Sequence, residues 1–267
     1  MTVTSIAIHG AAGRMGRRLV ALGAADPQLR IVAAVDSPTH PDLGKDAGVL
    51  AGLGEIGVPL VDSLGHAEPQ AVIDFSVPVA AETVTAVCIK RQLPLVMATT
   101  GLNEEQRQQL RTAAEAIPIV WSPSMSMTVN LAMKLCERAG LTLKDAAGGV
   151  DVEIIERHHR TKEDAPSGTA LKFGELIAAA MGQTVHRHGR QGQTGKRPAG
   201  EIGYHAVRTG DNPGEHTIVF GLLGETLEVV VKASSRDCYA TGALAAAKFI
   251  AGKKPGLYSM YDVLGLG

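Results

Sequence analysis

The chain has 267 residues, of which 45% are hydrophobic, and its formal net charge at pH 7 is −1. These values predict a globular protein of one large or two modest domains, and the near-zero charge gives no electrostatic support for nucleic-acid or membrane binding. The three cysteines, Cys88, Cys136 and Cys238, fit no metal-binding spacing, and no apolar run is long enough to span a bilayer. Together with an amino terminus that lacks a signal-peptide pattern, they predict a cytoplasmic protein with reduced thiols and no metal.

A Gly-rich turn follows the first expected strand, Val3 to His9. The turn reads GAAGRMG at residues 10–16, an apolar helical stripe follows it, and a second strand, Ile31 to Val35, ends at Asp36. Strand, Gly-rich turn, helix, strand and acid occur in the order that a dinucleotide-binding fingerprint requires. The G-x-x-G-x-x-G spacing is less common than G-x-G-x-x-G, and such turns also occur as plain loops, so the prediction depends on the surrounding elements.

Asp36 is placed to accept hydrogen bonds from the ribose hydroxyls of the adenosine. A carboxylate at this position repels a 2′-phosphate, and the next residue, Ser37, carries no positive charge that would attract one. We therefore predict NADH as the favoured cofactor and leave NADPH open as a second one. The alternative is that Asp36 is an ordinary turn residue, because Asp-Ser-Pro forms turns in many proteins.

Strands and helices alternate through the rest of the first half, after a Gly-, Pro- and Asp-rich connection with one short helix at residues 37–66. The expected strands are Ala71–Phe75, Leu95–Ala98 and Ile119–Trp121, and the expected helices are Val79–Lys90 and Glu104–Ala116. This alternation predicts a Rossmann-like α/β domain with a doubly wound parallel sheet. Such sheets bind ligands at the carboxyl ends of their strands, where three polar segments occur: Ser76–Pro78, Ala98–Gly101 and Ser122–Met125.

The second half of the chain is expected to form an α+β domain. An apolar helix at Met125–Ala139 and a strand at Val150–Glu156 begin it, and a long Gly-, Arg- and His-rich surface loop is expected at Val185–Glu201. Three strands with short turns then predict an antiparallel meander: Ile202–Arg208, Glu215–Leu222 and Thr226–Ala233. A final helix is expected at Gly242–Ala251.

The most distinctive stretch, HHRTKEDAPSGTA, runs from His158 to Ala170. If the preceding strand persists, Glu156 and His158 share one face and His159 points the other way. A metal site at the two histidines is not favoured, because no third ligand has suitable spacing. Instead, histidines that can donate a proton and the cation Lys162 lie just before the start of a helix. This combination is typical of a site that holds a small anion and protonates it.

Ser167 is expected to cap that helix, and Gly182 is placed to end it. The free N–H groups of the first turn, on Gly168 and Thr169, can bind a carboxylate or a phosphate. An ordinary capped helix after an ordinary loop is the alternative interpretation. The histidines and the lysine just upstream favour a site.

This stretch resembles the signature His-His-x-x-Lys-x-Asp-Ala-Pro-Ser-Gly-Thr-Ala of the dihydrodipicolinate (4-hydroxy-tetrahydrodipicolinate) reductase family of diaminopimelate and lysine biosynthesis. The signature is complete here. Residues 10–17, GAAGRMGR, and the later run GEHTIVF…GETLEVVVKASSR are also similar to the family. The resemblance extends over essentially the whole chain except residues 37–66.

The resemblance implies reduction of 4-hydroxy-tetrahydrodipicolinate, or dihydrodipicolinate, to tetrahydrodipicolinate with hydride from NADH or NADPH. His158 resembles the catalytic proton donor, and Lys162 resembles its cationic partner. The implied substrate contacts are His159, Gly168, Thr169 and Arg236, although an arginine at 236 fits a surface ion pair equally well. The implied cofactor contacts are Gly10, Ala11, Ala12, Gly13, Arg14, Met15, Asp36, Ala98, Thr99, Thr100, Ser122, Pro123, Ser124 and Met125. The chain departs from the family pattern at Ser37, Ala98 and Ser124, where relatives often have Arg, Gly and Asn.

The resemblance also implies two domains in a cytoplasmic homotetramer. The dinucleotide-binding domain would comprise residues 1–126 and 237–267. The domain for substrate binding and oligomerisation would comprise residues 127–236, with an open mixed sheet. Two other functions stay open: another two-domain NAD(P)-dependent amino-acid dehydrogenase, and a nucleotide-sensing repressor. The repressor is disfavoured because no DNA-reading helix or basic face is visible.

Overall fold

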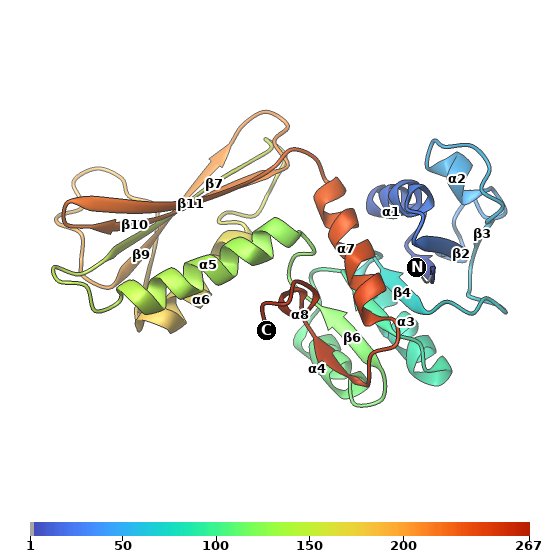
Figure 1. Ribbon diagram of the computed structural model, residues 1–267. Coiled ribbons are helices and arrows are strands. Elements are labelled where there is room, and N and C mark those ends of the chain that lie inside the picture. Colours follow the sequence, from blue (N-terminus) through green and yellow to red (C-terminus); the bar gives the residue numbers. More distant parts are fainter. Residues whose placement is uncertain (1–2) are drawn as a thin grey trace. The chain divides into compact units, whose positions relative to one another are not determined.

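The computed structural model describes residues 3–267, so the first two residues of the expected first domain lie outside it. The chain divides into two compact units (Figure 1). Unit 1 contains the chain up to Met127 together with Asp237–Gly267, and unit 2 contains Thr128–Arg236. Among residues 3–267, no helix is long and apolar enough to cross a membrane.

Unit 1 is built on a seven-stranded sheet in the order β12-β6-β5-β4-β1-β2-β3, in which all neighbours are parallel. The strands are β1 (Thr4–His9), β2 (Leu29–Val35), β3 (Leu60–Val61), β4 (Ala71–Asp74), β5 (Leu95–Met97), β6 (Pro118–Trp121) and β12 (Gly256–Tyr258). The chain winds outward from β1 in both directions, so the strand order reverses between β1 and β4. The predicted doubly wound sheet is confirmed, and this reversal is where such sheets bind ligands.

Helices cover both faces of this sheet. They are α1 (Arg14–Ala25), α2 (Ala47–Leu50), α3 (Pro78–Arg91), α4 (Glu104–Ala113), α7 (Asp237–Ile250) and α8 (Met260–Val263). Ile6 and Ile8 of β1 pack in one apolar cluster with residues of α1 and α7, and Ala7 packs in a second cluster with residues of α3 and α4. Alternate residues of a strand thus bury opposite faces of the sheet.

The connection at residues 37–66 is irregular except for α2, the expected short helix, and the two-residue strand β3. Asp46 organises it, because this one carboxylate accepts backbone N–H groups from both ends of the loop. The donors are Gly48 at 2.8 Å, Val49 at 3.3 Å, Ile56 at 3.0 Å and Val58 at 3.0 Å. The hydrogen bonds of the Asp46 side chain therefore fix the conformation of this connection, which the pattern of apolar residues does not predict.

Unit 2 contains a five-stranded mixed sheet in the order β11-β10-β7-β9-β8. Its strands are β7 (Asp151–His158), β8 (Val185–His188), β9 (Glu201–Arg208), β10 (Gly214–Leu222) and β11 (Glu225–Ala233), and its helices are α5 (Met127–Leu143) and α6 (Gly168–Met181). Strand β10 runs antiparallel to β7 and β11, whereas β9 runs parallel to β7 and β8. The predicted α+β domain with a mixed sheet is confirmed.

The predicted meander of three strands is wrong, because β7 lies between β9 and β10. Buried polar pairing explains this position: Glu156 of β7 binds Arg208 of β9 and lies opposite His216 of β10. The loop predicted at Val185–Glu201 is also partly wrong, because its first residues form β8. The exposed residues of β8 give no apolar pattern, yet the ring of Tyr204 on β9 stacks with His186 and His188.

The two faces of this sheet differ in what covers them. Helix α6 packs on β7 and β9, and α5 packs on α6 where Gly140 faces Met181. The opposite face carries apolar side chains in the open, with Ile155 41% exposed, Val207 43% and Val230 48%. Ile155 and Val230 lie in one row across the sheet, since each is the register partner of Thr217. Exposed apolar residues gathered on one face of a sheet are typical of an interaction surface.

Candidate active site

The Gly-rich turn lies at the carboxyl end of β1, beside the reversal of strand order. Gly10 has φ +79°, and a Cβ at this position would lie 2.7 Å from the carbonyl oxygen of Phe75. A Cβ at Gly16 would lie 2.0 Å from the carbonyl oxygen of Gly10. The turn therefore packs so closely on β4 and α1 that only glycine fits at these two positions, as in a phosphate-binding cradle.

Asp36 connects the end of β2 to this turn. One of its carboxylate oxygens accepts the N–H of Ala12 and the other accepts the N–H of Ser37, each at 2.8 Å. The side chain of Arg17 donates to the carbonyl oxygen of Ala12 at 2.8 Å. The structure thus brings the predicted acid and the predicted Gly-rich turn into direct contact.

A buried carboxylate joins three strand ends at the same edge of the sheet. Asp74, at the end of β4, is fully buried. Its Oδ1 lies 2.6 Å from His9 Nδ1 and accepts the Ser76 hydroxyl at 2.7 Å, and its Oδ2 accepts the Thr99 hydroxyl at 2.7 Å. The Ser76 N–H donates to Thr99 Oγ1 at 3.0 Å. The Thr99 hydroxyl therefore holds its own turn in place by donating to Asp74 and accepting from Ser76.

Replacing Thr99 with valine is expected to lower the free energy of unfolding by about 1–3 kcal/mol, because Asp74 would lose a donor in a fully buried position. The urea midpoint of the intact chain, followed by circular dichroism, measures this change. Thr100→Val is the matched control, since Thr100 is exposed and should shift the midpoint little. Equal midpoints for the two variants would contradict a structural role for the Thr99 hydroxyl.

The remaining predicted cofactor residues differ in exposure. Ala98, Ser122 and Met125 are buried, and the Met125 side chain packs in an apolar cluster of unit 1. A cofactor contact from the Met125 side chain is therefore not favoured. The exposed side chains of this set are those of Arg14, Thr100 and Pro123.

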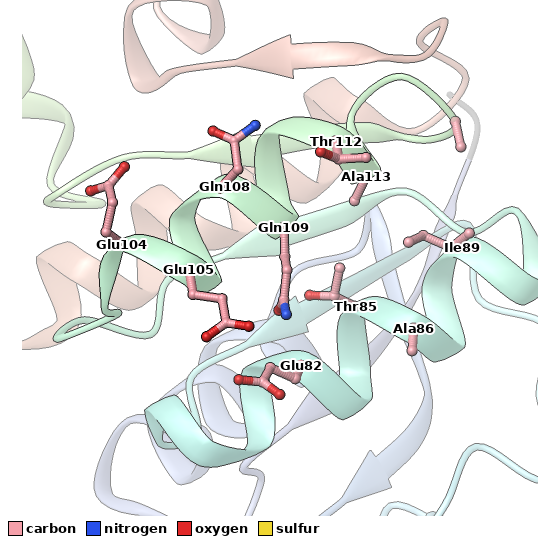
Figure 2. Close-up of a pocket in the computed structure, with 11 residues that line it drawn as sticks. Glu82, Thr85, Ala86, Ile89, Glu104, Glu105, Gln108, Gln109, Thr112 and Ala113 are labelled. Atoms are coloured by element: carbon pink, nitrogen blue, oxygen red, sulfur yellow. The ribbon is translucent and has the colours of Figure 1, made fainter.

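An open groove of about 910 Å³ lies between α3 and α4 (Figure 2). It is lined by helix residues, among them Glu82, Ile89, Glu104 and Glu105. None of the predicted site residues lines it. The groove is therefore separate from the cradle at the strand ends.

The predicted catalytic histidine lies in unit 2, at the end of β7. His158 is 7% exposed, and its Nδ1 lies 2.5 Å from Oε2 of Glu156, which is 1% exposed. The two side chains share one face of β7, as the strand parity predicts. The hydrogen bonds from Arg208 and His158 outweigh burial and lower the pKa of Glu156. Because a carboxylate only accepts, Nδ1 of His158 carries the hydrogen.

The second ring nitrogen of His158 is the one available to a substrate. Among residues 3–267, Nε2 makes no hydrogen bond. Gly214 lies beneath it, and a Cβ at that position would be only 2.8 Å from Nε2. The ring therefore presents one nitrogen to Glu156 and leaves the other free for proton transfer.

Lys162 and His159 lie on the loop that follows β7. The Lys162 ammonium donates to Asp164 Oδ1 at 2.7 Å, and its side chain is 21% exposed. His159 Nδ1 lies 2.8 Å from the Thr161 hydroxyl. Both functional side chains thus have partners within the loop, and neither is buried.

Helix α6 begins where the sequence predicts. Ser167 is its N-cap and accepts the N–H of Ala170 at 3.2 Å, and Gly182 ends the helix in the left-handed conformation. The first helical bond is that of Leu171, so the N–H groups of Gly168 and Thr169 have no partner among residues 3–267. Space is open beside Gly168. This helix start can accept an anion.

A second buried histidine, His216 of β10, supports this helix start. Its Nε2 lies 3.1 Å from the Ser167 hydroxyl, and its ring meets that of His158 edge to face at 5.3 Å. Burial, and then the nearby His158, lower the pKa of His216 to about 4. His216 is therefore neutral at pH 7, and its Nε2 shares a hydrogen bond with the Ser167 hydroxyl.

Arg236 is the last residue of unit 2 and is exposed. Within the described part of the chain it has no ion-pair partner, so the alternative of a surface ion pair is not supported. The described residues also contain no group of three or more His, Cys, Asp or Glu side chains that could hold a metal ion.

Sequence reasoning missed four residues of these two sites: His9, Asp74, Arg208 and His216. Two of them, His9 and Asp74, could have been found from the sequence, because each is a polar or charged residue at the end of a mostly apolar strand. Arg208 and His216 could not, because their partners lie on other strands and the strand order was not predicted.

Comparisons with known proteins agree with this arrangement along the whole chain. A family model described as dihydrodipicolinate reductase, N-terminus, matches residues 4–125, and one described as dihydrodipicolinate reductase, C-terminus, matches residues 128–264. The chain is 59% identical to 4-hydroxy-tetrahydrodipicolinate reductase of Rhodopirellula baltica, over 98% of this chain and 96% of that one. It is 46% identical to the reductase of the same name from Burkholderia thailandensis, over the full length of both chains.

A solved structure shows the same fold. It is dipicolinate-bound dihydrodipicolinate reductase from Paenisporosarcina sp. TG-14, with a TM-score of 0.79 and 24% sequence identity. The match covers 98% of this chain and 99% of that one.

Proposed function

Because the chain belongs to the dihydrodipicolinate reductase family, we propose that it reduces 4-hydroxy-tetrahydrodipicolinate to tetrahydrodipicolinate with a nicotinamide dinucleotide. Unit 1 holds the dinucleotide and unit 2 holds the substrate. The observation that carries this proposal is the His158 ring, fixed through Nδ1 by Glu156 and free at Nε2, on the same loop as Lys162. The alternative, another two-domain amino-acid dehydrogenase, has no matching observation.

The dinucleotide fits the residues of unit 1. At Gly10 and Gly16 the neighbouring backbone leaves no space for a side chain, so the turn between β1 and α1 keeps the close packing that a pyrophosphate-binding turn requires. Asp36, already oriented by Ala12 and Ser37, has lone pairs left for the ribose hydroxyls. When bound, the cofactor supplies hydride to the substrate.

The residues of unit 2 bind and protonate the substrate. The N–H groups of Gly168 and Thr169 donate to one carboxylate of the substrate, and His159 and Arg236 contact its remaining polar groups. As negative charge develops in the ring, His158 Nε2 delivers a proton to the carbon beside the one that accepts hydride. The Lys162 ammonium stabilises charge at the ring nitrogen. Lys162 must exchange part of its contact with Asp164 for this role.

The protonation state of His158 should depend on the bound substrate. Burial lowers the pKa of His158 and Glu156 raises it, while Lys162 and Arg208 lower it further, with a net downward shift. A bound dicarboxylate adds negative charge and raises that pKa. Because an acid must hold its proton, the rate falls as pH rises through this pKa.

We therefore expect the falling limb of kcat, which reports the enzyme–substrate complex, at higher pH than the falling limb of kcat/KM, which reports the free enzyme. Initial rates across pH 5 to about 9 at saturating NADH measure both limbs. Coinciding limbs, or a kcat/KM that rises through this range, would contradict His158 as the acid.

The cofactor preference follows from Asp36 and Ser37. A 2′-phosphate would meet the Asp36 carboxylate without an adjacent arginine at position 37. NADH is therefore the favoured cofactor, and NADPH stays open as a second one.

The test of this function is oxidation of NADH and NADPH by the purified protein, with 4-hydroxy-tetrahydrodipicolinate generated in the same cuvette by its synthase. Turnover that is equal or better with NADH supports both the reaction and the Asp36 argument. A strong preference for NADPH keeps the reaction and rejects the argument from Asp36 and Ser37. Folded protein that binds NADH without turnover points to the dehydrogenase alternative.

The open face of the unit 2 sheet is the surface through which we propose that the chain forms a homotetramer. Val230→Asp introduces a charge into the apolar row with Ile155, and it should convert the assembly to a smaller species with the fold retained. Sedimentation velocity measures the mass. Val79→Asp is the control, because this exposed residue lies in the first turn of α3, where an acid is favourable. An unchanged mass for Val230→Asp places the interface elsewhere.

A further inference from the structure

The buried carboxylate of Glu156 accepts four hydrogen bonds. Oε2 accepts from His158 Nδ1 at 2.5 Å and from Arg208 Nη1 at 2.8 Å. Oε1 accepts from Arg208 Nη2 at 2.8 Å and from the Ser167 N–H at 3.1 Å. Each oxygen thus binds Arg208 and one further group, and those two groups are the candidate acid and the N-cap of α6.

Arg208 extends this contact to the loop that carries Lys162. Its Nη2 also donates to the carbonyl oxygen of Asp164 at 2.6 Å, and its Nε donates to that of Lys162 at 3.3 Å. The Arg208 side chain is 19% exposed, so these bonds are partly shielded from water. The planar guanidinium binds the carboxylate with one edge and the loop backbone with the rest, which a lysine cannot do.

A buried ion pair of this kind is not required for stability. Removing charges from water is costly, and well-packed apolar residues often replace such a pair without loss. What apolar residues could not provide here is a fixed ring tautomer and a fixed loop backbone. Apart from their bonds to each other, Glu156 and Arg208 form hydrogen bonds with groups of the candidate site. The one exception is the bond from Arg208 to the carbonyl oxygen of the neighbouring Val207.

We propose that the Glu156–Arg208 pair is the positioning unit of the active site. It holds His158 with Nδ1 protonated and Nε2 toward the substrate, and it sets the backbone of the loop that presents Lys162. This inference rests on the proposed reductase function. Glu156 and Arg208 act through His158 and Lys162 and do not touch the substrate.

The pair also sets the charge around the His158 ring. The titratable and charged groups that face this ring are Glu156 on β7, Arg208 on β9, His216 on β10 and Lys162 on the loop. Glu156 is the only one of these four that favours the protonated ring. Neutralising Glu156 should therefore change the pH profile as well as the rate, which a purely structural contact would not do.

The experiment compares Glu156→Gln with wild type in the coupled assay. The variant keeps the shape of the side chain and removes its charge. We expect kcat to fall about 10- to 100-fold, less than the roughly 10²- to 10⁴-fold that loss of the acid itself would cost, because His158 is retained. The falling limb of kcat/KM should move to lower pH. The dissociation constant for NADH, measured by fluorescence, should not change. Wild type without turnover rejects the reductase function itself, whereas an active wild type with an unaltered variant rejects only the positioning unit.

Two further variants decide between positioning and fold support. Glu175→Gln is the control, because Glu175 forms an exposed ion pair with Lys172 on α6, at 3.0 Å, and its loss should leave kcat unchanged. Arg208→Lys keeps the positive charge but loses the planar guanidinium that binds the carboxylate and the loop backbone together, so kcat should fall about tenfold or more. This variant decides the outcome if Glu156→Gln does not fold. Wild-type kcat in Arg208→Lys, or a Glu156→Gln profile that falls in rate without moving in pH, overturns the proposal.

Discussion

Replacing His158 with glutamine is expected to lower kcat by about 10²- to 10⁴-fold, the range of general acid catalysis. Glutamine can still accept or donate hydrogen bonds near Glu156, but it cannot release a proton near neutral pH. His158 lies in unit 2, and the dinucleotide cradle lies in unit 1. The dissociation constant of NADH should therefore stay within about twofold of wild type.

Steady-state rates in the coupled assay and NADH fluorescence titrations measure the two quantities. His159→Gln is an informative comparison, because within residues 3–267 this neighbour pairs with the Thr161 hydroxyl alone and has no carboxylate partner. As a substrate contact it should raise KM more than it lowers kcat. A His158→Gln enzyme with wild-type kcat, or one that has also lost NADH binding, would remove His158 from the role of acid.

The fold of unit 1 was predictable because each of its signals is local. The Gly-rich turn, the apolar strands and the acid at Asp36 lie within one strand–helix–strand repeat, and each appears in the sequence without knowledge of distant contacts. The weakest elements were missed for the same reason. β3 and β12 have only two and three residues, and unlike the equally short but fully buried β5 they include residues that are not buried, so neither gives an apolar run.

The core of the candidate substrate site is contained in one continuous signature. The loop from His158 to Thr169, its N-cap Ser167 and the parity of Glu156 with His158 all follow from neighbouring residues. The residues that hold this loop in place were not predictable. Arg208 lies 52 positions from Glu156, and only the pairing of β9 with β7 brings them together. Because the three later strands were assigned to a meander, that pairing was not foreseen.

The same distinction applies to Thr99 and Asp74. The sequence marks Thr99 as a polar residue at a strand end, which fits a ligand contact. The structure shows its hydroxyl bound to a buried carboxylate 25 positions away. A polar residue near a site can thus serve the scaffold, and the sequence does not separate the two uses.

Gly16→Ala is expected to lower the free energy of unfolding by about 3 kcal/mol and to weaken NADH binding more than tenfold. Gly16 lies in the first turn of α1, where an added Cβ would be 2.0 Å from the Gly10 carbonyl oxygen and 2.6 Å from Ala11. These contacts are backbone atoms, which cannot move aside as a flexible side chain can. The helix must therefore shift away from the turn, and the N–H groups of the cradle lose their arrangement.

Gly23→Ala is the matched control on the same helix. Its Cβ would meet Ile31, Leu244 and Ile6 side chains at 3.5 to 3.6 Å, which is ordinary contact, and alanine favours a helix over glycine by about 0.5–1 kcal/mol. Gly23→Ala should thus be as stable as wild type or more so, with NADH affinity unchanged. Urea denaturation measures the stability of both variants, and fluorescence titration measures their NADH affinity. The comparison shows whether the effect comes from the contact of Gly16 with the turn or from any added side chain on α1. If Gly16→Ala binds NADH with the same affinity as Gly23→Ala, NADH binding does not depend on the close packing of Gly16 against Gly10 and Ala11. The cradle assigned to residues 10–16 would then be wrong.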